Sequence, residues 1–532
     1  MRKFSVRLTN EQWGWLFVAG LAFCGGLQLL RGFVALFGPV STDYSEMMVA
    51  GMARQWLDSG RLAFSYTPPD APYGMPGVQY PPLFIGLTAV LMKASGLGAV
   101  LAARLLAWAA YAAAGAMVGL LVWRETAHKK MALYAACFPF TFWSVLIFIN
   151  GARPDPLALF LSLLAVYIYR GGRERQNPAL IKLVIVALTL ALAFYAKQTY
   201  LAAAAAIFFD LALARGRRYA LFFGGAYAGL VGVIGLGICQ VASEGQFVGI
   251  FEPGRAGRFI FHLAPAMLGF FLLDHAPLII LAGLALGWQW RRGQLFWPLY
   301  AFFATLACSS IVKDGAVDYY FNEVAYLLSV QAALGIMRFH SVAFSRQLLV
   351  GSPQISGSSP PVKAIIEERE AAAANTFTKV FPQIRPSPAI VNGLLAVQLV
   401  IAIGMLVGWN QGRDNDSFGR VDQEARAIVE QYQQSGKPAL IFQNNLLLDT
   451  NQVNLIGDYF IYWILIGNGQ RDIGPLQRDL ENRRYELILV GSPEFRRWPP
   501  ALNRPLEAGY NLRILAGSDG RPLYWLYQRK PE

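Results

Sequence analysis

Residues 99–123 read AVLAARLLAWAAYAAAGAMVGLLVW, and Arg124 closes the run. About 20 mostly apolar residues in a helix cross the hydrocarbon core of a bilayer, so this run predicts a transmembrane helix. The composition of the chain agrees, because 55% of its 532 residues are hydrophobic and only 15% are charged. Such a composition excludes a set of soluble domains, a disordered chain and a small disulfide-rich scaffold.

Further apolar runs are closed off by charged residues and are long enough, or nearly so, to cross the membrane. The chain is therefore predicted to be a mainly α, polytopic membrane protein with about 11 transmembrane helices. Residues 82–97 are also apolar, but Lys93 and the Gly-Leu-Gly at 96–98 favour a helix lying at the membrane interface. The other predicted spans are 13–37, 131–149, 156–170, 179–196, 199–214, 219–241, 267–290, 294–312, 320–338 and 390–409.

Lysines and arginines are predicted to set the orientation of the chain. If the N-terminus is cytoplasmic, the inside loops carry about twice as many of them as the longer outside loops before the last span. An odd number of spans then places the C-terminal segment outside the cytoplasm. The net charge of +13 would suggest nucleic-acid binding in a soluble protein. In this chain the predicted topology accounts for the positive charge, and no nucleic-acid partner is predicted.

Composition divides the chain into segments. Residues 1–340 form a transmembrane module, in which residues 38–98 make the first outside loop. Residues 341–389 contain the Gly, Ser, Pro and Ala stretches of a flexible cytoplasmic linker. After the last span at 390–409, residues 410–532 alternate helix-like and strand-like patterns, which predicts a small extracytoplasmic α/β domain. Its strand-like runs begin at Ala439, Tyr485, Leu512 and Leu523, and its helix-like patterns cover 419–434 and 474–482.

Four cysteines lie in strongly apolar stretches, where a thiol behaves as a small hydrophobic side chain. Their spacing matches neither a disulfide framework nor a zinc site, and no metal site is predicted. They are Cys24, Cys137, Cys239 and Cys308.

Polar residues gather at the predicted outer ends of the spans. An enzyme that handles a lipid phosphate needs this combination at one membrane face, because cations hold the phosphate and a carboxylate takes a proton from an acceptor hydroxyl. The set consists of Asp43 with Glu46, Tyr80, Arg153 with Asp155, Lys197, Arg255 with Arg258, Lys313, and Asp318 with Tyr320 and Glu323.

Short motifs in this set are similar to those of the GT-C glycosyltransferases, among them bacterial aminoarabinose transferases and protein O-mannosyltransferases. The resemblance covers about residues 1–340. It implies an inverting glycosyltransferase of the bacterial inner membrane, with a polyprenyl-phosphate-linked sugar as donor, a lipid, glycan or protein as acceptor, and membrane lipids around it. The motifs are Ser41-Thr-Asp-Tyr-Ser-Glu46, Tyr80-Pro-Pro-Leu83, Arg153-Pro-Asp-Pro-Leu157, Lys197-Gln-Thr199 and Asp318-Tyr-Tyr-Phe-Asn-Glu323.

The resemblance also implies roles for single residues. Asp43 would be the general base, and Glu46, three residues later on the same helical face, would partly replace the second acid of many relatives. No cofactor and no general acid are required, because the phosphodiester leaving group departs as a stable anion. Binding of a divalent cation by this loop stays open. The implied residues are Asp43, Glu46 and Asp155 for catalysis, Lys197, Arg255, Arg258 and Lys313 for the donor phosphate, and Tyr66, Tyr80, Asp318 and Tyr320 for the sugar or acceptor.

Several of these residues have structural alternatives. Asp155 before a proline is equally typical of a helix N-cap, and Glu323 is favoured as a cap of the span at 320–338. Lys197 stands at a span end, where lysines often snorkel to the interface. The pair Asp274-His275 falls within a predicted span, and is explained best if residues 259–273 lie along the outer surface and the span begins near His275, with Pro277 in its first turn.

A transporter or flippase for a lipid or lipid-linked saccharide is the alternative function, because the same cations would steer an anionic head group. A transport path needs polar residues through the membrane, whereas most predicted spans are free of charge at mid-depth. A non-catalytic scaffold that displays the C-terminal domain is a third, weaker hypothesis.

Overall fold

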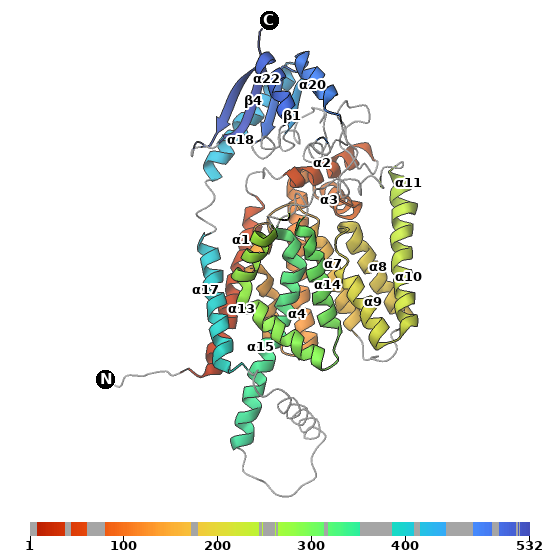
Figure 1. Cartoon of the computed structure of the whole chain (residues 1–532), viewed down its shortest axis with the longest axis vertical. Helices are drawn as coiled ribbons and strands as arrows, with labels where there is room; N and C mark the ends of the chain where they lie inside the picture. The colour runs from red at the N-terminus through yellow and green to blue at the C-terminus, as the bar shows by residue number, and fades with distance from the viewer. Residues whose placement is uncertain are drawn as a thin grey trace, which may run out of the picture.

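The computed structural model consists of a bundle of long helices with a small α/β domain at one end (Figure 1). Helix α1 begins at the opposite end of the bundle from this domain. The structure describes residues 8–37, 44–60, 80–171, 179–243, 264–312, 318–351, 386–408, 415–442, 472–491, 499–517 and 522–531, with the single residues 247, 261, 466 and 520.

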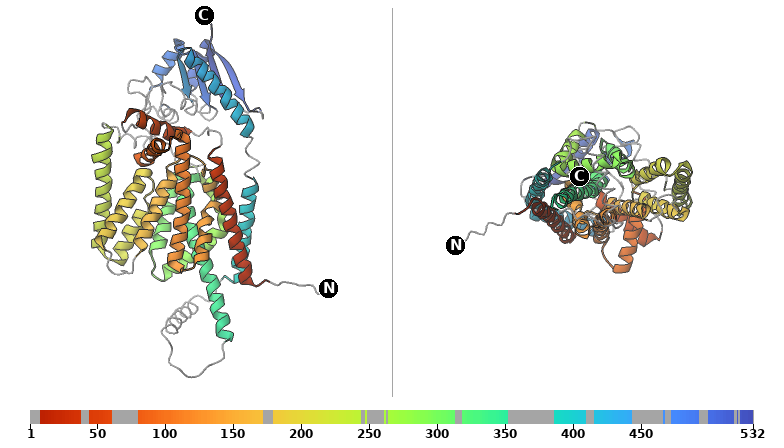
Figure 2. Two further views of the ribbon diagram at one scale, coloured as in Figure 1. Left: turned by 180° about the vertical axis from the view of Figure 1, so that it is seen from behind. Right: turned by 90° about the horizontal axis from the view of Figure 1, so that it is seen from below.

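Helices coincide with the predicted spans almost throughout the described chain. Five of them are long and apolar enough to cross a bilayer, at Asn10–Ala35, Ala99–Thr126, Arg217–Ala242, Ala264–Arg291 and Pro388–Val407. The bundle helices are α1 (Asn10–Ala35), α4 (Ala99–Thr126), α7 (Asp155–Arg170), α8 (Leu180–Ala196), α9 (Ala202–Ala214), α10 (Arg217–Gly232, continued by the π-helix η2 Val233–Cys239 and α11 Gln240–Ala242), α13 (Ala264–Arg291), α14 (Phe296–Cys308, followed by η4 Ser309–Val312), α15 (Asn322–Gly351) and α17 (Pro388–Gly408). Figure 2 shows α17 beside α1 at one edge of the bundle and α10 at the other.

The predicted span at 131–149 is broken. It consists of α5 (Lys129–Cys137), the 3-10 turn η1 (Phe138–Thr141) and the short α6 (Trp143–Leu146). Pro139 lacks the backbone N–H that a continued α-helix would use at this position, which favours the break. All four residues of η1 are buried by neighbouring helices, as non-helical backbone inside a membrane must be.

Helix α13 corrects the expectation for Asp274 and His275. It runs without interruption from Ala264 to Arg291, so the described part of residues 259–273 does not form a separate surface helix. Pro277 lies inside α13 rather than in its first turn. His275 is fully buried, and its Nε2 accepts a hydrogen bond of 3.3 Å from the backbone N–H of Trp143. The histidine thus satisfies a donor that the break before α6 leaves without a helical partner.

Close backbone contact joins α4 to α5. The segment Gly115-Ala-Met-Val-Gly119 has the GxxxG spacing that brings membrane helices together. A Cβ atom at Gly115 would lie 2.7 Å from the carbonyl oxygen of Ala136, and one at Gly119 would lie 2.7 Å from that of Ala132. Both positions therefore require glycine.

Two helices stand at the end of the bundle that carries the C-terminal domain. Helix α2 (Tyr44–Ser59) lies across this end and contacts α3 (Pro82–Ser95), which is the helix predicted for the interface (Figure 1). Arg54 and Asp58 form an exposed pair at 3.7 Å on α2, as expected for a solvated face. This end of the bundle is where the predicted site residues were expected.

The C-terminal domain has a four-stranded sheet of order β1-β2-β4-β3. Strand β1 (Ala439–Phe442) is parallel to β2 (Leu487–Gly491), whereas β4 (Pro522–Arg529) is antiparallel to both β2 and β3 (Tyr510–Ala516). Helix α18 (Asn415–Gln434) packs Val421, Ala425 and Val429 on one face of the sheet, at the four-residue spacing of one helical face. The strands agree with the four predicted runs, and α20 (Gly474–Glu481) with the second predicted helix; η7 (Pro500–Leu502) and α22 (Asn503–Gly509) were not predicted.

Candidate active site

A buried ion pair joins α7 to α8. The Nζ atom of Lys197 lies 2.6 Å from Oδ1 of Asp155, and the two side chains are only 4% and 3% exposed. Asp155 is the first residue of α7 and Lys197 follows the last residue of α8, so consecutive antiparallel helices bring them to the same end of the bundle. Asp155 makes no capping bond, because Pro154 occupies the N-cap position, and Lys197 does not snorkel to the surface. Both structural alternatives for these residues are therefore wrong.

Three tyrosine rings surround the ammonium group of Lys197. Its Nζ lies 4.0 Å from the ring centroid of Tyr319, 5.4 Å from that of Tyr320 and 5.7 Å from that of Tyr80. The rings of Tyr319 and Tyr320, both in the 3-10 turn η5 (Asp318–Phe321), are stacked 4.8 Å apart. Aromatic faces attract a cation, so these rings help to hold the ammonium group in place.

A second cation lies on the same tyrosine. The guanidinium of Arg153 is 4.7 Å from the Tyr319 ring and 4.4 Å from the ring of Phe148, and Arg153 is 6% exposed. Together with Asp155 and Lys197, it forms a buried cluster of two cations and one carboxylate. We call Arg153, Asp155, Lys197 and Tyr319 the cation cluster. Oδ2 of Asp155 has no hydrogen-bond partner among the described residues.

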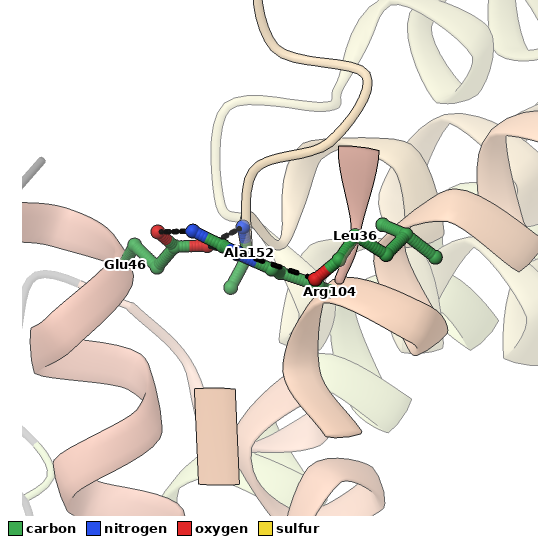
Figure 3. A network of polar contacts seen from close by, with 4 residues as sticks. All are labelled: Leu36, Glu46, Arg104 and Ala152. Carbon is green, nitrogen blue, oxygen red and sulfur yellow. Dashed lines mark hydrogen bonds and ion pairs between the residues drawn. The ribbon is translucent and has the colours of Figure 1, made fainter. Parts of the chain in front are cut away.

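Glu46 lies in a different buried network, shown in Figure 3. Its carboxylate accepts hydrogen bonds from Arg104 Nε at 2.6 Å and Nη2 at 2.9 Å, and Oε1 also accepts one from the backbone N–H of Ala152 at 2.9 Å. Arg104 Nη1 donates to the carbonyl oxygen of Leu36 at 3.3 Å. Glu46 is not exposed at all, and both of its oxygens are occupied. This geometry differs from that of a catalytic acid or base open to substrate.

Buried tyrosines and α15 lie next to the cluster. Asn322 Nδ2 donates to the hydroxyl of Tyr111 at 3.0 Å, and the Tyr300 hydroxyl donates to Glu323 Oε1 at 3.0 Å. Glu323 is thus engaged by a neighbouring helix instead of acting only as a cap of α15. Asp318 opens the turn η5 beside Tyr319, and burial together with the nearby charge of Asp274 raises the pKa of its carboxyl.

The structure brings together four of the predicted site residues, namely Asp155, Lys197, Tyr80 and Tyr320. Asp318 precedes Tyr319 in the same turn. Glu46 lies in the separate network with Arg104, and the remaining predicted residues lie outside the described part of the chain. The roles of all these residues stay predictions. Those outside the described part are Asp43, Tyr66, Arg255, Arg258 and Lys313.

Sequence reasoning missed the importance of Arg104, and it gave Tyr319 no role of its own within the motif Asp318–Glu323. Arg104 lies inside an apolar span, and a charge in such a place is by itself a functional hypothesis with a partner to be found. That signal was available in the sequence. Tyr319 stands between two residues that were singled out, and only the packing of η5 on both cations distinguishes it from them.

No protein-family model and no curated protein matches the chain by sequence. The comparison with solved structures does find matches. ArnT from Cupriavidus metallidurans, in a crystal structure bound to undecaprenyl phosphate, is 14% identical with a TM-score of 0.51, over 97% of this chain and 98% of that one. The oligosaccharyltransferase of Archaeoglobus fulgidus is 11% identical with a TM-score of 0.52, over 97% of this chain and 74% of that one. The chain has the GT-C fold. At these identities the likeness is one of fold, and it agrees with the resemblance of the motifs.

Proposed function

We propose that this protein is an inverting glycosyltransferase. It moves a sugar from a polyprenyl-phosphate donor to a hydroxyl group of a lipid, glycan or protein, at the extracytoplasmic face of a bacterial cell membrane. The cation cluster carries this proposal. Its two buried cations suit the negative charge of a sugar phosphodiester, because burial strengthens the attraction between opposite charges. The crystal structure of ArnT with undecaprenyl phosphate supports a ligand of this kind.

The reaction requires one displacement at the anomeric carbon. The acceptor oxygen forms a bond to this carbon while the bond from the carbon to the phosphate oxygen breaks, and polyprenyl phosphate leaves with the electron pair. Lys197 and Arg153 stabilise the negative charge that grows on the phosphate. The acceptor proton passes to a carboxylate, for which we propose Asp43. Attack from the face opposite the phosphate inverts the anomeric configuration.

Aromatic rings give the same site a surface for the sugar. Tyr80 and Tyr320 flank the ammonium of Lys197 and present ring faces next to the proposed phosphate position. A sugar ring packs its C–H face on such rings, while the phosphate contacts the cations. The donor would thus be held at two points on either side of the bond that breaks.

Binding of undecaprenyl phosphate tests the proposal without knowledge of the sugar. The full-length protein in lipid nanodiscs should bind undecaprenyl phosphate and discriminate against the uncharged undecaprenol. Lys197→Met should weaken the binding of undecaprenyl phosphate by about 10-fold or more, because one cation of a buried phosphate site is lost. Lys182→Met, at the other end of the same helix, is the matched control and should bind as wild type does. Equal affinity for the phosphate and the alcohol in the wild-type protein would overturn the proposal.

The acceptor is best found in cells. Mass spectrometry of envelope glycolipids and polymers, with and without the protein, should reveal one species whose mass differs by a sugar residue. The same comparison with Lys197→Met should lack that species, whereas Lys182→Met should retain it.

A further inference from the structure

Four segments of the chain meet at the buried pair Glu46–Arg104 (Figure 3). We propose that these two side chains are positioning residues, which hold Ala152 and thereby place Arg153 and Asp155 of the cation cluster. The inference rests on the proposed function for its effect on phosphate binding. It assigns to Glu46 a role different from direct catalysis, and it adds Arg104 to the residues on which the site depends.

The contacts of the pair are spread over distant parts of the chain. Arg104 on α4 donates to the Leu36 carbonyl, which is the C-cap of α1, and to Glu46 in the first turn of α2. A cation at the C-terminal end of a helix and an anion at the N-terminal end of another both suit the helix dipoles. The carboxylate of Glu46 then reaches the turn before α7 through the N–H of Ala152. The pair therefore links α1, α2, α4 and that turn.

The turn needs the acceptor that Glu46 supplies. The N–H of Arg153 donates to the carbonyl of Gly151 at 3.0 Å, which closes a tight turn with Ala152 at its centre. Ala152 is fully buried, so water cannot satisfy its N–H. A buried backbone donor without a partner is costly, and the turn would rearrange to find one.

A displacement of the backbone at Ala152 is expected to displace the residues of the cation cluster that follow it. Arg153 is the next residue, and Asp155 lies between Pro154 and Pro156, whose rings fix φ near −65°. This stiff segment absorbs little displacement by rotation of its own bonds. The side chains of Arg153 and Asp155 are therefore expected to shift with the turn, away from Tyr319 and Lys197.

The burial of this ion pair does not by itself show that the pair stabilises the fold, because apolar side chains of similar size often stabilise a protein equally well. The acceptor for Ala152 is different, since no apolar side chain can supply it. The positioning role of Glu46 can therefore be tested separately from its contribution to the stability of the protein. Two double variants remove both charges, so that neither leaves an unpaired buried ion, and they differ only at position 46.

The first variant is Glu46→Leu with Arg104→Met, and the second is Glu46→Gln with Arg104→Met. In the second, the amide oxygen of glutamine can still accept from Ala152. Three quantities are measured on full-length protein in nanodiscs: the unfolding temperature, the hydrogen exchange of the Ala152 amide, and the dissociation constant of undecaprenyl phosphate. The matched control, Glu125→Leu with Arg170→Met, removes a pair that joins α4 and α7 at the other end of the bundle.

We expect both position-46 variants to have similar unfolding temperatures. The leucine variant should exchange the Ala152 amide at least about 10-fold faster and bind undecaprenyl phosphate about 10-fold more weakly, as the loss of one buried hydrogen bond implies. The glutamine variant should stay close to wild type in both, as should the control. Equal exchange and equal binding in the two position-46 variants would overturn the inference. If wild type itself does not distinguish undecaprenyl phosphate from undecaprenol, the proposed function fails, while the exchange comparison still decides whether Glu46 positions the turn.

Discussion

Lys197 and Asp155 lie 42 residues apart in the chain, yet Nζ and Oδ1 are 2.6 Å apart and shielded from solvent. The pair neutralises two groups that would be costly to bury singly, and the guanidinium of Arg153 lies on the same Tyr319 ring as Lys197. Two buried cations side by side suit the anionic phosphate of the proposed donor.

Removal of one partner of this pair should destabilise the protein. Lys197→Met leaves Asp155 buried without its cation, and such a change typically costs about 3–5 kcal/mol. Thermal unfolding in nanodiscs should show the loss. The double variant Lys197→Met with Asp155→Leu should recover most of the stability but still bind undecaprenyl phosphate more weakly than the wild type does. A double variant as unstable as the single one would contradict this account.

The ring of Tyr319 should matter more than its hydroxyl. Its centroid lies 4.0 Å from Lys197 Nζ and 4.7 Å from Arg153, and a cation on an aromatic face is stabilised by about 0.5–2 kcal/mol. Tyr319→Leu should therefore weaken undecaprenyl phosphate binding by about 3-fold to 30-fold, whereas Tyr319→Phe should bind nearly as wild type. Titration of both variants checks this. Equal losses would assign the role to the hydroxyl.

Asp43→Asn should abolish sugar transfer and leave expression and undecaprenyl phosphate binding intact. The reason is that an amide cannot accept the proton of the acceptor hydroxyl, although it has nearly the same size. The glycolipid profile of cells that carry the variant measures transfer, and the binding assay measures donor recognition. Full transfer by this variant would remove Asp43 as the base.

His275 is expected to support the fold and not to carry protons. Its Nε2 accepts from the Trp143 N–H, so His275→Leu should cost about 1–3 kcal/mol of stability and His275→Gln less. Because this histidine is structural, neither change should alter the dependence of sugar transfer on pH between about 6 and 8, the range in which histidines usually titrate. An altered pH dependence of sugar transfer in both variants would show that His275 takes part in proton transfer.

The orientation in the membrane is tested by reporter fusions. Fusions after Arg7 and Arg124 should give cytoplasmic signals, and a fusion after Gly412 should give an extracytoplasmic one, following the distribution of basic residues. A cytoplasmic signal at Gly412 would place the cation cluster on the wrong side for an extracytoplasmic donor.

Most of the architecture was predictable from local patterns. Length and hydropathy placed nearly every helix of the bundle, and short strand-like runs between polar helix-like patterns placed the four strands of the C-terminal sheet. The pattern failed at residues 131–149, because a run of apolar residues does not reveal whether Pro139 ends a helix or merely bends it. It also failed at Pro277, which lies inside a continuous helix. In both cases the neighbouring helices decide whether the proline ends the helix, because they supply the hydrogen-bond partners for the backbone.

By itself, the sequence determined that this is a polytopic membrane protein with polar residues gathered at one end of its helices, since hydropathy and charge are properties of short segments. Only the tertiary structure decided which charges pair: Lys197 with Asp155, and Arg104 with Glu46. Ion pairs depend on distances of a few ångströms between residues far apart in the chain, and burial decides how strongly they interact. These distances exist only after the helices have packed.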